Sequence, residues 1–394
     1  MARILLGWDN GLGTGYVDRL LTVADALAAE GHEPVLSVRD LITTAGRLAD
    51  VRYPVLQSPV AIGQLDPISP SFSPGSFADL LGASNFNNET ELTRLMLAWD
   101  VLFQTVRPDL VVAEYAPVMS LAAYGRYKLL AMGHGYILPP PELPQFPVFD
   151  YARPAFVPQE TVLAVCRRVQ AARGVPQIAT LPGFYGGTAH VVTAYPELDP
   201  YDGLRAQKAD GPLEAHAPAP LPAAPRFYAY LAADFRQLRL ALESLVNSRL
   251  PGSVHIKRLT PTLRQYLVER GIEVLDRAPP LEQAVARASV VIHHGGIATT
   301  MAALGMGRPQ MLWPHVTDQT VTARAVEHLR VGEAGMRAGR SGADVGPALR
   351  RIADDLDMAR RAQDLAQRLA RRHAKGSLEI VLAKARALLE QTTF

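Results

Sequence analysis

The apolar positions between residues 289 and 323 follow one another as a strand, a helix, a second strand and the start of a second helix. Residues 290–292 are a short β-branched run, typical of a parallel strand that is buried on both faces. Residues 299–304 are compatible with a helix that ends at the Gly and Pro punctuation of residues 305–309. Residues 310–313 are typical of the next buried strand.

A glycine turn separates this first strand from its helix. The chain must turn at His294, Gly295 and Gly296, so the glycines lie at the N-terminus of the predicted helix. The unpaired backbone N–H groups and the positive end of the helix dipole favour an anion there, such as a diphosphate, and no metal ion is required. The second strand brings Asp318 and Gln319 to the same edge of the sheet, where their side chains suit the hydroxyl groups of a sugar.

The N-terminus predicts another βαβ unit. Residues 3–6 form a short strand, residues 17–29 carry apolar positions at helical spacing, and residues 34–38 begin a second strand. The glycines between strand and helix require tight turns and let a ligand approach the backbone closely. They are Gly11, Gly13 and Gly15.

A dinucleotide-binding fingerprint is only partly present in this loop. Its third glycine would fall at position 16, where the chain has Tyr16, although Asp40 lies where a ribose-binding acid is expected. An NAD-dependent oxidoreductase is therefore a distant alternative.

The composition narrows the class of protein. A length of 394 residues predicts about two to three domains. A hydrophobic fraction of 48%, a charged fraction of 20% and a net charge of +2 are typical of a globular protein without a nucleic-acid partner. Because Cys166 is the only cysteine and neither a signal peptide nor a transmembrane run is recognisable, we expect a cytoplasmic protein.

The spacing of polar residues between positions 294 and 319 resembles that of the family 1 glycosyltransferases of GT-B fold, in particular their bacterial, UDP-glycosyltransferase-like members. The resemblance implies an α/β protein with two Rossmann-like lobes of parallel sheet that face across a cleft, and a last helix that crosses back to the first lobe. The pattern H-x-G-x-x-T, A-L-x-x-G-x-P and P-x-x-x-D-Q is matched by His294, Gly296, Thr299, Ala303, Leu304, Gly307, Pro309, Pro314, Asp318 and Gln319.

The resemblance also implies a donor site. Capping of the helix N-terminus is a second explanation for Thr299 and is compatible with phosphate binding. The implied residues are His294, Gly295, Gly296 and Thr299 for the diphosphate, Asp318 and Gln319 for the sugar, and Pro279 and Pro280 for the nucleobase.

The acceptor side departs from the family pattern. The histidine that family members use as general base is replaced by Tyr16, and Glu114 stands where an Asp is common. A phenol with a pKa near ~10 is a poor base at neutral pH. Three explanations stay open: Asp18 or Glu114 acts as the base, the acceptor is acidic enough to need only orientation, or the chain binds a nucleotide sugar without transferring it. Ordinary structural roles are open too, because Asp18 suits a first helical turn and Glu114 could pair with an Arg.

Long connections are expected on the acceptor side. Residues 67–82 and 133–158 are rich in Pro and Phe, and they predict loops that either form an aromatic acceptor surface or pack on the lobe. Gly13, Gly15 and His134 are the residues expected at the acceptor cleft.

Composition also predicts the division of the chain. Residues 206–225 are rich in Ala and Pro and predict an extended linker. The region after residue 348 is helical and rich in Arg; peripheral contact with an anionic membrane is one explanation, and the interleaved acids favour a solvated face. The expected organisation is an acceptor-binding lobe at 1–205, a linker at 206–226, a donor-binding lobe at 227–375 and a returning helix at 376–394.

The resemblance thus implies an inverting, metal-independent glycosyltransferase of secondary metabolism. It would move a sugar from a nucleoside diphosphate of UDP or TDP type to a small molecule, such as an aromatic or lipid-like compound, without a further cofactor. A nucleotide-sugar-binding protein without transfer activity is the nearer alternative. The acceptor, the donor and the oligomeric state depend on loop shapes that one sequence does not fix.

Overall fold

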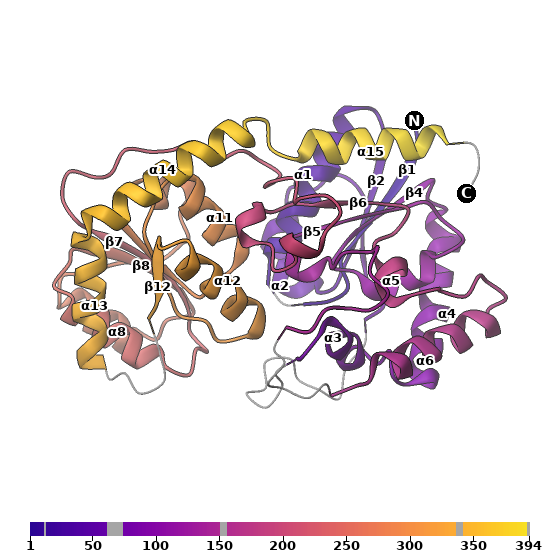
Figure 1. Ribbon diagram of the computed structural model, residues 1–394, viewed down its shortest axis with the longest axis horizontal. Helices are drawn as coiled ribbons and strands as arrows, with labels where there is room; N and C mark the ends of the chain where they lie inside the picture. Colours follow the sequence, from indigo (N-terminus) through magenta and orange to yellow (C-terminus); the bar gives the residue numbers. More distant parts are fainter. Residues whose placement is uncertain (12, 61–73, 150–155, 336–341, 392–394) are drawn as a thin grey trace. The chain divides into compact units, whose positions relative to one another are not determined.

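The computed structural model describes residues 1–11, 13–60, 74–149, 156–335 and 342–391. The chain divides into two compact units, of which the first comprises Met1–Leu213 with Lys375–Phe394 and the second Glu214–Ala374. Each unit is built on one six-stranded sheet with helices around it (Figure 1). The domain boundary at Leu213 falls inside the segment for which a linker is expected.

The sheet of the first unit is parallel throughout and has the strand order β3-β2-β1-β4-β5-β6. The order reverses between β1 and β4, so the connections leave their carboxyl ends in opposite directions. The strands are β1 (Arg3–Gly7), β2 (Glu33–Val38), β3 (Val55–Gln57), β4 (Leu110–Glu114), β5 (Leu129–Gly133) and β6 (Ala189–Val192).

The helices of the first unit include the last one of the chain. This helix, α15 (Leu378–Glu390), packs against α1 and against β4, β5 and β6 (Figure 1). Its buried face, formed by Val381, Leu382, Ala385 and Leu388, explains why the apolar spacing persists to the end of the chain. The other helices are α1 (Gly15–Ala29), α2 (Leu41–Leu48), α3 (Phe77–Ala83), α4 (Glu89–Val106), α5 (Pro117–Ala123), α6 (Gln159–Ala172), α7 (Leu181–Tyr185), η1 (Gly135–Ile137), η2 (Pro196–Leu198) and η3 (Asp202–Leu204).

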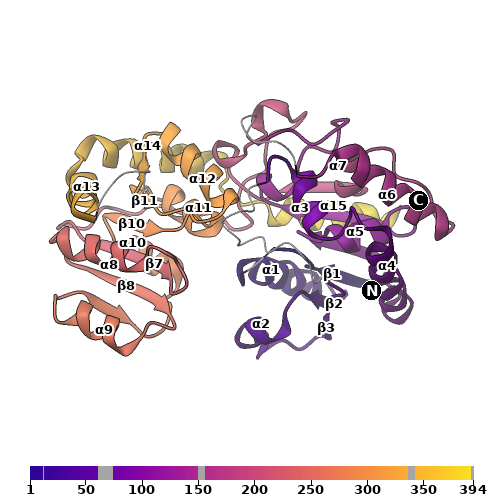
Figure 2. The same cartoon turned by 90° about the horizontal axis from the view of Figure 1, so that it is seen from below.

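The sheet of the second unit is also parallel and has the order β12-β11-β10-β7-β8-β9, with its reversal between β7 and β10. Figure 2 shows β7, β8 and β10 side by side in this unit. The strands are β7 (Phe227–Ala232), β8 (Gly252–Lys257), β9 (Glu273–Leu275), β10 (Val290–His293), β11 (Gln310–Leu312) and β12 (Gly332–Ala334). The helices are α8 (Leu238–Asn247), α9 (Pro261–Val268), α10 (Leu281–Ala286), α11 (Ile297–Gly305), α12 (Thr317–His328), α13 (Gly342–Asp354) and α14 (Leu356–Arg372).

Helices cover this second sheet on both faces, as the β-branched run at residues 290–292 predicts. Val290 and Ile292 belong to the apolar cluster that includes the buried residues of α8. Val291, between them in the strand, belongs to a different cluster with Ala284 and Val285 of α10. Successive side chains of one strand therefore enter two separate cores, which is why the run is apolar without alternation.

One predicted loop is partly wrong. Residues 67–82 were expected to form a long connection, and residues 67–73 lie outside the described residues. Within the remainder, α3 begins after Ser76, whose hydroxyl accepts a hydrogen bond from the backbone N–H of Ala78 (3.2 Å). The buried carboxylate of Asp79 holds this helix to two neighbouring segments, because it accepts from the N–H groups of Gly75 and Val157.

The expected linker contains no helix or strand but is bonded to both units along its length. Near its start, the N–H of Asp210 donates to the carbonyl of Val192, the last residue of β6, and the N–H of Gly211 donates to that of Ala194. Further on, the carbonyls of Ala219 and Pro220 accept from Arg308 in the second unit. None of the described helices is both long and apolar enough to span a bilayer.

Arg308 is buried completely and is satisfied by backbone carbonyls alone. Its guanidinium donates to the linker and to the carboxyl ends of α10 and α11, where carbonyl groups lack helical partners. No carboxylate in the described part of the chain forms an ion pair with it, and burial lowers the pKa of Arg308 to about 10. The accepting carbonyls are those of Val285, Ala286, Met306, Gly307, Ala219 and Pro220.

We predict that Arg308→Met lowers the free energy of unfolding of the second unit by about 3 kcal/mol or more, because several buried carbonyls lose their donor at once. Arg287→Met, at an exposed arginine that ends α10, is the matched control and should change it by less than about 0.5 kcal/mol. Urea unfolding followed by circular dichroism measures both. Equal effects of the two substitutions would contradict the role given to Arg308.

Candidate active site

The candidate donor site lies at the carboxyl ends of three neighbouring strands of the second unit. β11, β10 and β7 are adjacent in the sheet, and each is followed by a short connection to a helix. The strand order reverses between β7 and β10, which is where parallel α/β sheets bind their ligands.

His294 joins these three connections. Its Nε2 accepts from the N–H of Ala232 at the end of β7 (2.9 Å), and its Nδ1 is 2.8 Å from the carbonyl of Trp313 after β11. These partners assign the proton to Nδ1. Burial lowers the pKa of His294, so the ring is neutral at pH 7 with both nitrogens bonded to backbone. His294 was expected to bind the diphosphate. In the structure it forms a bridge between the ends of two strands.

The two glycines of the turn differ in their surroundings. Gly295 has a φ of +94°, and a Cβ at this residue would lie 2.9 Å from the carbonyl oxygen of Gln319. The two parts of the motif therefore touch, and only glycine permits the contact. Gly296 caps α11 with a φ of −59°, and a Cβ there would meet nothing within 4 Å. Open space thus lies over the N-terminus of α11.

Two threonines follow the glycines in α11. The hydroxyl of Thr300 donates to the carbonyl of Gly296 (3.0 Å), and Thr299 is buried in the third position of the helix. Neither side chain caps the helix N-terminus, so the capping explanation for Thr299 is wrong. The free N–H groups of the first turn are left for a ligand.

Asp318 and Gln319 lie in the first turn of α12, as the sequence predicts. Burial raises the pKa of Asp318 to about 6. The side-chain oxygen of Gln319 accepts from the backbone N–H of His315 (2.9 Å), which fixes the connection between β11 and α12. His315 itself was not among the residues that the sequence singled out.

A group of rings supports this connection. Phe235, after β7, packs edge-on against His294 (4.8 Å between ring centroids), Trp313 (6.1 Å) and His315 (5.8 Å). The rings of His294 and His315 are 5.5 Å apart. The signal that sequence reasoning missed is the placement of Phe235 and His315 shortly after β7 and β11, the two strands that flank β10.

Pro279 and Pro280 precede α10, and Pro280 is its N-terminal cap. Pro279 lines a cavity of about 100 Å³ together with Tyr228, Leu275 and residues of α10. The structure gives Pro279 a place on the face of the sheet that α10 covers and gives no contact between it and the glycine turn.

The acceptor-side candidates of the first unit meet at the carboxyl end of β4. Glu114 is completely buried, and its Oε1 accepts from Nε of Arg19 in α1 (2.8 Å). Its other oxygen, Oε2, has no hydrogen-bond partner among the described residues. Burial raises the pKa of Glu114, and Arg19 opposes that increase.

Tyr16 takes part in the same cluster through its ring. The ring stacks on Trp8 (5.5 Å), is tilted against Tyr115 (5.5 Å) and lies 5.1 Å from the guanidinium carbon of Arg19. Tyr16 and Glu114 therefore share Arg19 as a neighbour.

Asp18 is not brought to this cluster. It forms an ion pair with Arg47 of α2 (3.4 Å) in which both side chains are about half exposed, although partial burial raises the pKa of Asp18.

His134, expected at the acceptor cleft, follows β5 and is buried. Burial, together with the nearby charge of Arg19, lowers the pKa of His134 to about 3. Of the glycines, Gly13 takes a φ of +109° in open space and Gly15 begins α1.

Asp9 is a functional candidate that the sequence reasoning missed. It lies at the carboxyl end of β1, and its Oδ2 accepts from the N–H of Met119 in α5 (2.8 Å). Its Oδ1 is buried without a partner among the described residues. Burial raises the pKa of Asp9 to about 8, which is unusual for a carboxylic acid and typical of functional sites. The signal in the sequence is an acid directly after an apolar strand.

Phe146 and Phe149 of the 133–158 connection pack against other rings, whereas Phe156 is exposed. Phe146 is buried against Phe77 with 5.1 Å between ring centroids, and Phe149 stacks on Tyr136 (4.8 Å).

Asp40 has a structural role, because its carboxylate caps α2 by accepting hydrogen bonds from the backbone N–H groups of Ile42 and Thr43. The acid that favoured a ribose site is therefore explained by helix capping.

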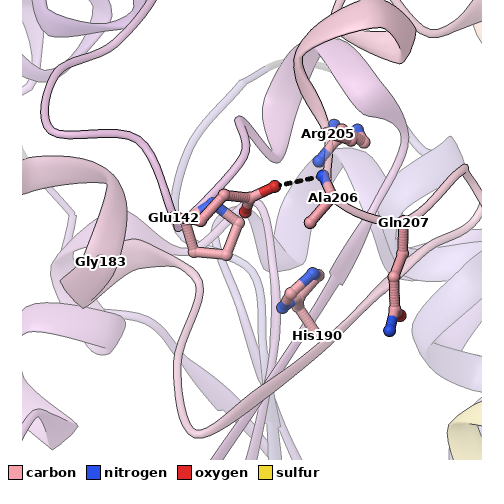
Figure 3. A pocket seen from close by; sticks show the side chains of 7 residues that line it. Glu142, Gly183, His190, Arg205, Ala206 and Gln207 are labelled. Atoms are coloured by element: carbon pink, nitrogen blue, oxygen red, sulfur yellow. Dashed lines mark hydrogen bonds between the residues drawn. The ribbon is translucent and has the colours of Figure 1, made fainter.

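The 133–158 connection also borders a cavity of about 420 Å³ in the first unit (Figure 3). Glu142 accepts from the N–H of Ala206 (2.6 Å), and the ring of His190 lies between Glu142 and Gln207. The volume is in the range of small-molecule sites, and the lining offers both donors and acceptors. Among the described residues, no group of His, Cys, Asp and Glu side chains is arranged to hold a metal ion.

Comparison with known proteins identifies the class. The family described as "Erythromycin biosynthesis protein CIII-like, C-terminal domain" matches residues 265–380. The L-demethylnoviosyl transferase of Streptomyces niveus is 26% identical over 333 residues, which cover 81% of this chain and 82% of that protein. The elloramycin glycosyltransferase ElmGT of Streptomyces olivaceus is 46% identical over 55 residues, or 14% of either chain.

Solved structures agree over the whole chain. The calicheamicin glycosyltransferase CalG4 superposes with a TM-score of 0.71 at 17% identity and covers 99% of both chains. The glycosyltransferase VinC, solved with DTDP, gives a TM-score of 0.64 at 16% identity over 98% of this chain and 99% of that one.

The fold is therefore the two-lobed α/β GT-B fold of sugar-transferring enzymes. The motif spacing and the relatives above make the chain similar to the family 1 glycosyltransferases and identify it as a glycosyltransferase.

We predict that the two neighbouring glycines respond differently to the same added methyl group. Gly295→Ala should lower the free energy of unfolding by about 2 kcal/mol, because φ is positive and Cβ meets the carbonyl of Gln319. Gly296→Ala should leave it unchanged or raise it by up to about 1 kcal/mol, because its conformation suits any residue. Urea denaturation measures both variants, and a more damaging Gly296→Ala would contradict the geometry of the turn.

Proposed function

We propose that this glycosyltransferase is an inverting, metal-independent enzyme that moves a sugar from a nucleoside diphosphate of UDP or TDP type to a small-molecule acceptor. The second unit holds the donor and the first holds the acceptor. The observation that carries the proposal is the open N-terminus of α11 at Gly296, beside Asp318 and Gln319.

The donor diphosphate would lie over the first turn of α11. The N–H groups from Gly296 to Thr299 and the helix dipole supply fixed positive potential there, and they stabilise the charge that develops on the leaving diphosphate. Positive potential from backbone supports a mechanism without a metal ion. In this scheme His294 holds the turn in place through Ala232 and Trp313.

The donor sugar would be held by Asp318 and Gln319. A carboxylate accepts hydrogen bonds from two hydroxyl groups, and the amide of Gln319 retains its N–H₂ group as a donor. The VinC structure with DTDP supports a thymidine or related nucleotide. Acceptors of the type named for the relatives, elloramycin and calicheamicin, support a small product of secondary metabolism.

The acceptor hydroxyl must lose a proton as it attacks the anomeric carbon, and a buried carboxylate would receive it. Support for Glu114 comes from its place at the end of β4 and from the unpartnered Oε2. Asp9 has a second unpartnered oxygen at the end of β1, but burial raises its pKa to about 8, so it would receive the proton only in its deprotonated form above that pH. Tyr16 contributes packing to this cluster, whereas the ion pair with Arg47 occupies Asp18.

Binding and turnover test the proposal in sequence. We expect UDP or TDP and one of their sugars to raise the melting temperature of the protein, and NAD to leave it unchanged. Gly296→Ala should weaken nucleotide binding without loss of stability, because its methyl group enters the space above α11. If no nucleoside diphosphate changes the melting temperature, the donor site proposed here is wrong. If nucleotide sugars bind but no acceptor of a broad panel is glycosylated, the protein binds nucleotide sugars without transferring them.

Stereochemistry and metal dependence follow from the same assay. With an active acceptor, nuclear magnetic resonance of the product should show the anomeric configuration opposite to that of the donor. Addition of a chelator should leave the rate within about twofold, since fixed backbone dipoles replace the metal ion. Retention of configuration, or loss of rate that a divalent cation restores, would contradict the mechanism.

Substitution by the corresponding amide distinguishes the catalytic roles of the acids in the first unit. Glu114→Gln should lower kcat by about 100-fold or more if Glu114 receives the proton, and Asp9→Asn should do so if Asp9 does. Asp18→Asn tests the remaining acid on α1. Near-normal turnover of all three variants with an alcohol acceptor would exclude a carboxylate base.

The pH dependence of the unfolding free energy tests the protonation state of Asp9 independently of turnover. The folded protein keeps the proton of Asp9 up to about pH 8, whereas an unfolded aspartate loses it near pH ~4. This group therefore lowers the unfolding free energy as pH rises from about 4 to about 8. Asp9→Asn, which keeps an acceptor for Met119, should gain stability relative to wild type over that window even if turnover is lost. Equal pH dependence of the two proteins would contradict a buried, protonated Asp9.

A further inference from the structure

The cavity of about 420 Å³ in the first unit lies between parts of the chain that are far apart in the sequence (Figure 3). Its described lining residues differ from those assigned above to the donor and to the proton of the acceptor. Its volume is in the range of pockets that hold small molecules. The lining includes Pro141 and Glu142 of the 133–158 connection, His190 of β6, and Arg205, Ala206 and Gln207 after η3.

The walls of this cavity are fixed by contacts within the protein. Arg205 is almost completely buried, forms an ion pair with Asp199, and donates through Nη2 to the carbonyl of Leu138 (2.5 Å). Glu142 accepts from the backbone N–H of Ala206 (2.6 Å). The bonds to Leu138 and Glu142 both join the 133–158 connection to the segment after η3, so the cavity is formed without a ligand.

Polar groups of the lining have hydrogen-bonding capacity left for a ligand. Among the residues drawn in Figure 3, the one hydrogen bond joins Glu142 to Ala206, and neither the ring of His190 nor the amide of Gln207 takes part in it. Nη1 of Arg205 is buried and has no hydrogen-bond partner among the described residues. A buried donor without an acceptor costs free energy, which an oxygen atom of a ligand would restore.

The charges around the cavity are of both signs. Burial and the positive charges of Lys384 and Arg205 lower the pKa of His190, and the carboxylate of Glu142 opposes that decrease. His190 is therefore a neutral ring at pH 7, with one nitrogen that donates and one that accepts. Because cations and a carboxylate lie around the same space, a neutral ligand with several hydroxyl groups fits it better than an ion of either sign.

We propose that this cavity is a binding site for a neutral saccharide unit. The hydroxyl groups of the sugar bond to Glu142, His190 and Gln207, and the ring of Pro141 lies against its carbon-bound hydrogens. The site is distinct from the donor site proposed above and does not depend on it. The sugar is either a free saccharide or one that the acceptor already carries.

Saturation-transfer nuclear magnetic resonance with the full chain tests the site in the absence of nucleotide. The probes are methyl α-D-glucopyranoside and methyl α-L-rhamnopyranoside, and at least one should bind with a dissociation constant on the order of 1 mM. His190→Ala should weaken binding about fivefold or more, because a partner of the hydroxyl groups is lost. Glu142→Gln, which keeps an acceptor for Ala206, should weaken it about threefold or more. His328→Ala, at the exposed end of α12, is the matched control and should leave binding unchanged.

A transfer assay then identifies the source of the sugar. Phenyl β-D-glucopyranoside is offered as acceptor together with a nucleotide sugar. Its glycosylation, with a KM that His190→Ala raises, would assign the bound sugar to the acceptor. Binding of phenyl β-D-glucopyranoside without glycosylation would assign the site to a free saccharide.

Two results would overturn the inference. The first is the absence of binding of either methyl glycoside at concentrations up to about 50 mM. The second is a dissociation constant that both His190→Ala and Glu142→Gln leave unchanged, in protein that melts as wild type does. Because no nucleotide enters the binding measurement, either result leaves the proposed donor site untouched.

Discussion

The parallel alignment of strands determines where every polar group of the candidate site lies. In a parallel sheet all carboxyl ends meet at one edge, so short connections from distant parts of the chain converge there. Asp9, Glu114 and His134 come from three strands of the first sheet, and they are neighbours only for this reason. The second sheet has the same order among its own strands and brings the connections after β7, β10 and β11 together in the same way.

The polar groups at the carboxyl edges of the two sheets are stabilised in different ways. In the first unit a single guanidinium, that of Arg19, lies against a buried carboxylate and leaves one carboxylate oxygen of Glu114 unpartnered. In the second unit His293 and His294 are neutral, and the positive potential comes from the helix α11. Arg308 shows the same use of backbone from the opposite side, because it neutralises the negative carboxyl ends of α10 and α11 instead of a side chain. Fixed dipoles thus replace ion pairs around the candidate donor site.

Sequence periodicity predicted the elements of the donor site well. The strand at residues 290–292, the helix after the glycines and the place of Asp318 and Gln319 in the first turn of a helix were all confirmed. Periodicity works there because the strand is buried on both faces and glycine interrupts it sharply. The helix α3 was missed because its apolar residues follow a stretch rich in Pro and Ser, and its stability comes from Asp79 bonding to distant segments.

The partners of the site residues could not be predicted in the same way. His294 was expected to bind a ligand, but its hydrogen bonds run to Ala232 and Trp313, which are 62 and 19 residues away in the chain. Such contacts depend on which strands are neighbours, and one sequence does not give that order. Asp9 was overlooked for a similar reason, since its burial requires α5 to lie against the end of β1.

Tyr16, at the position where the sequence resemblance places a histidine, has a packing role. The ring of Tyr16 lies among Trp8, Tyr115 and Arg19, a position that the smaller imidazole would fill only in part. Arg19 in turn donates to Oε1 of Glu114, and Oε2 has no hydrogen-bond partner among the described residues. In the mechanism proposed above, the proton of the acceptor goes to a buried group that already has an unpartnered oxygen, and Glu114 offers one.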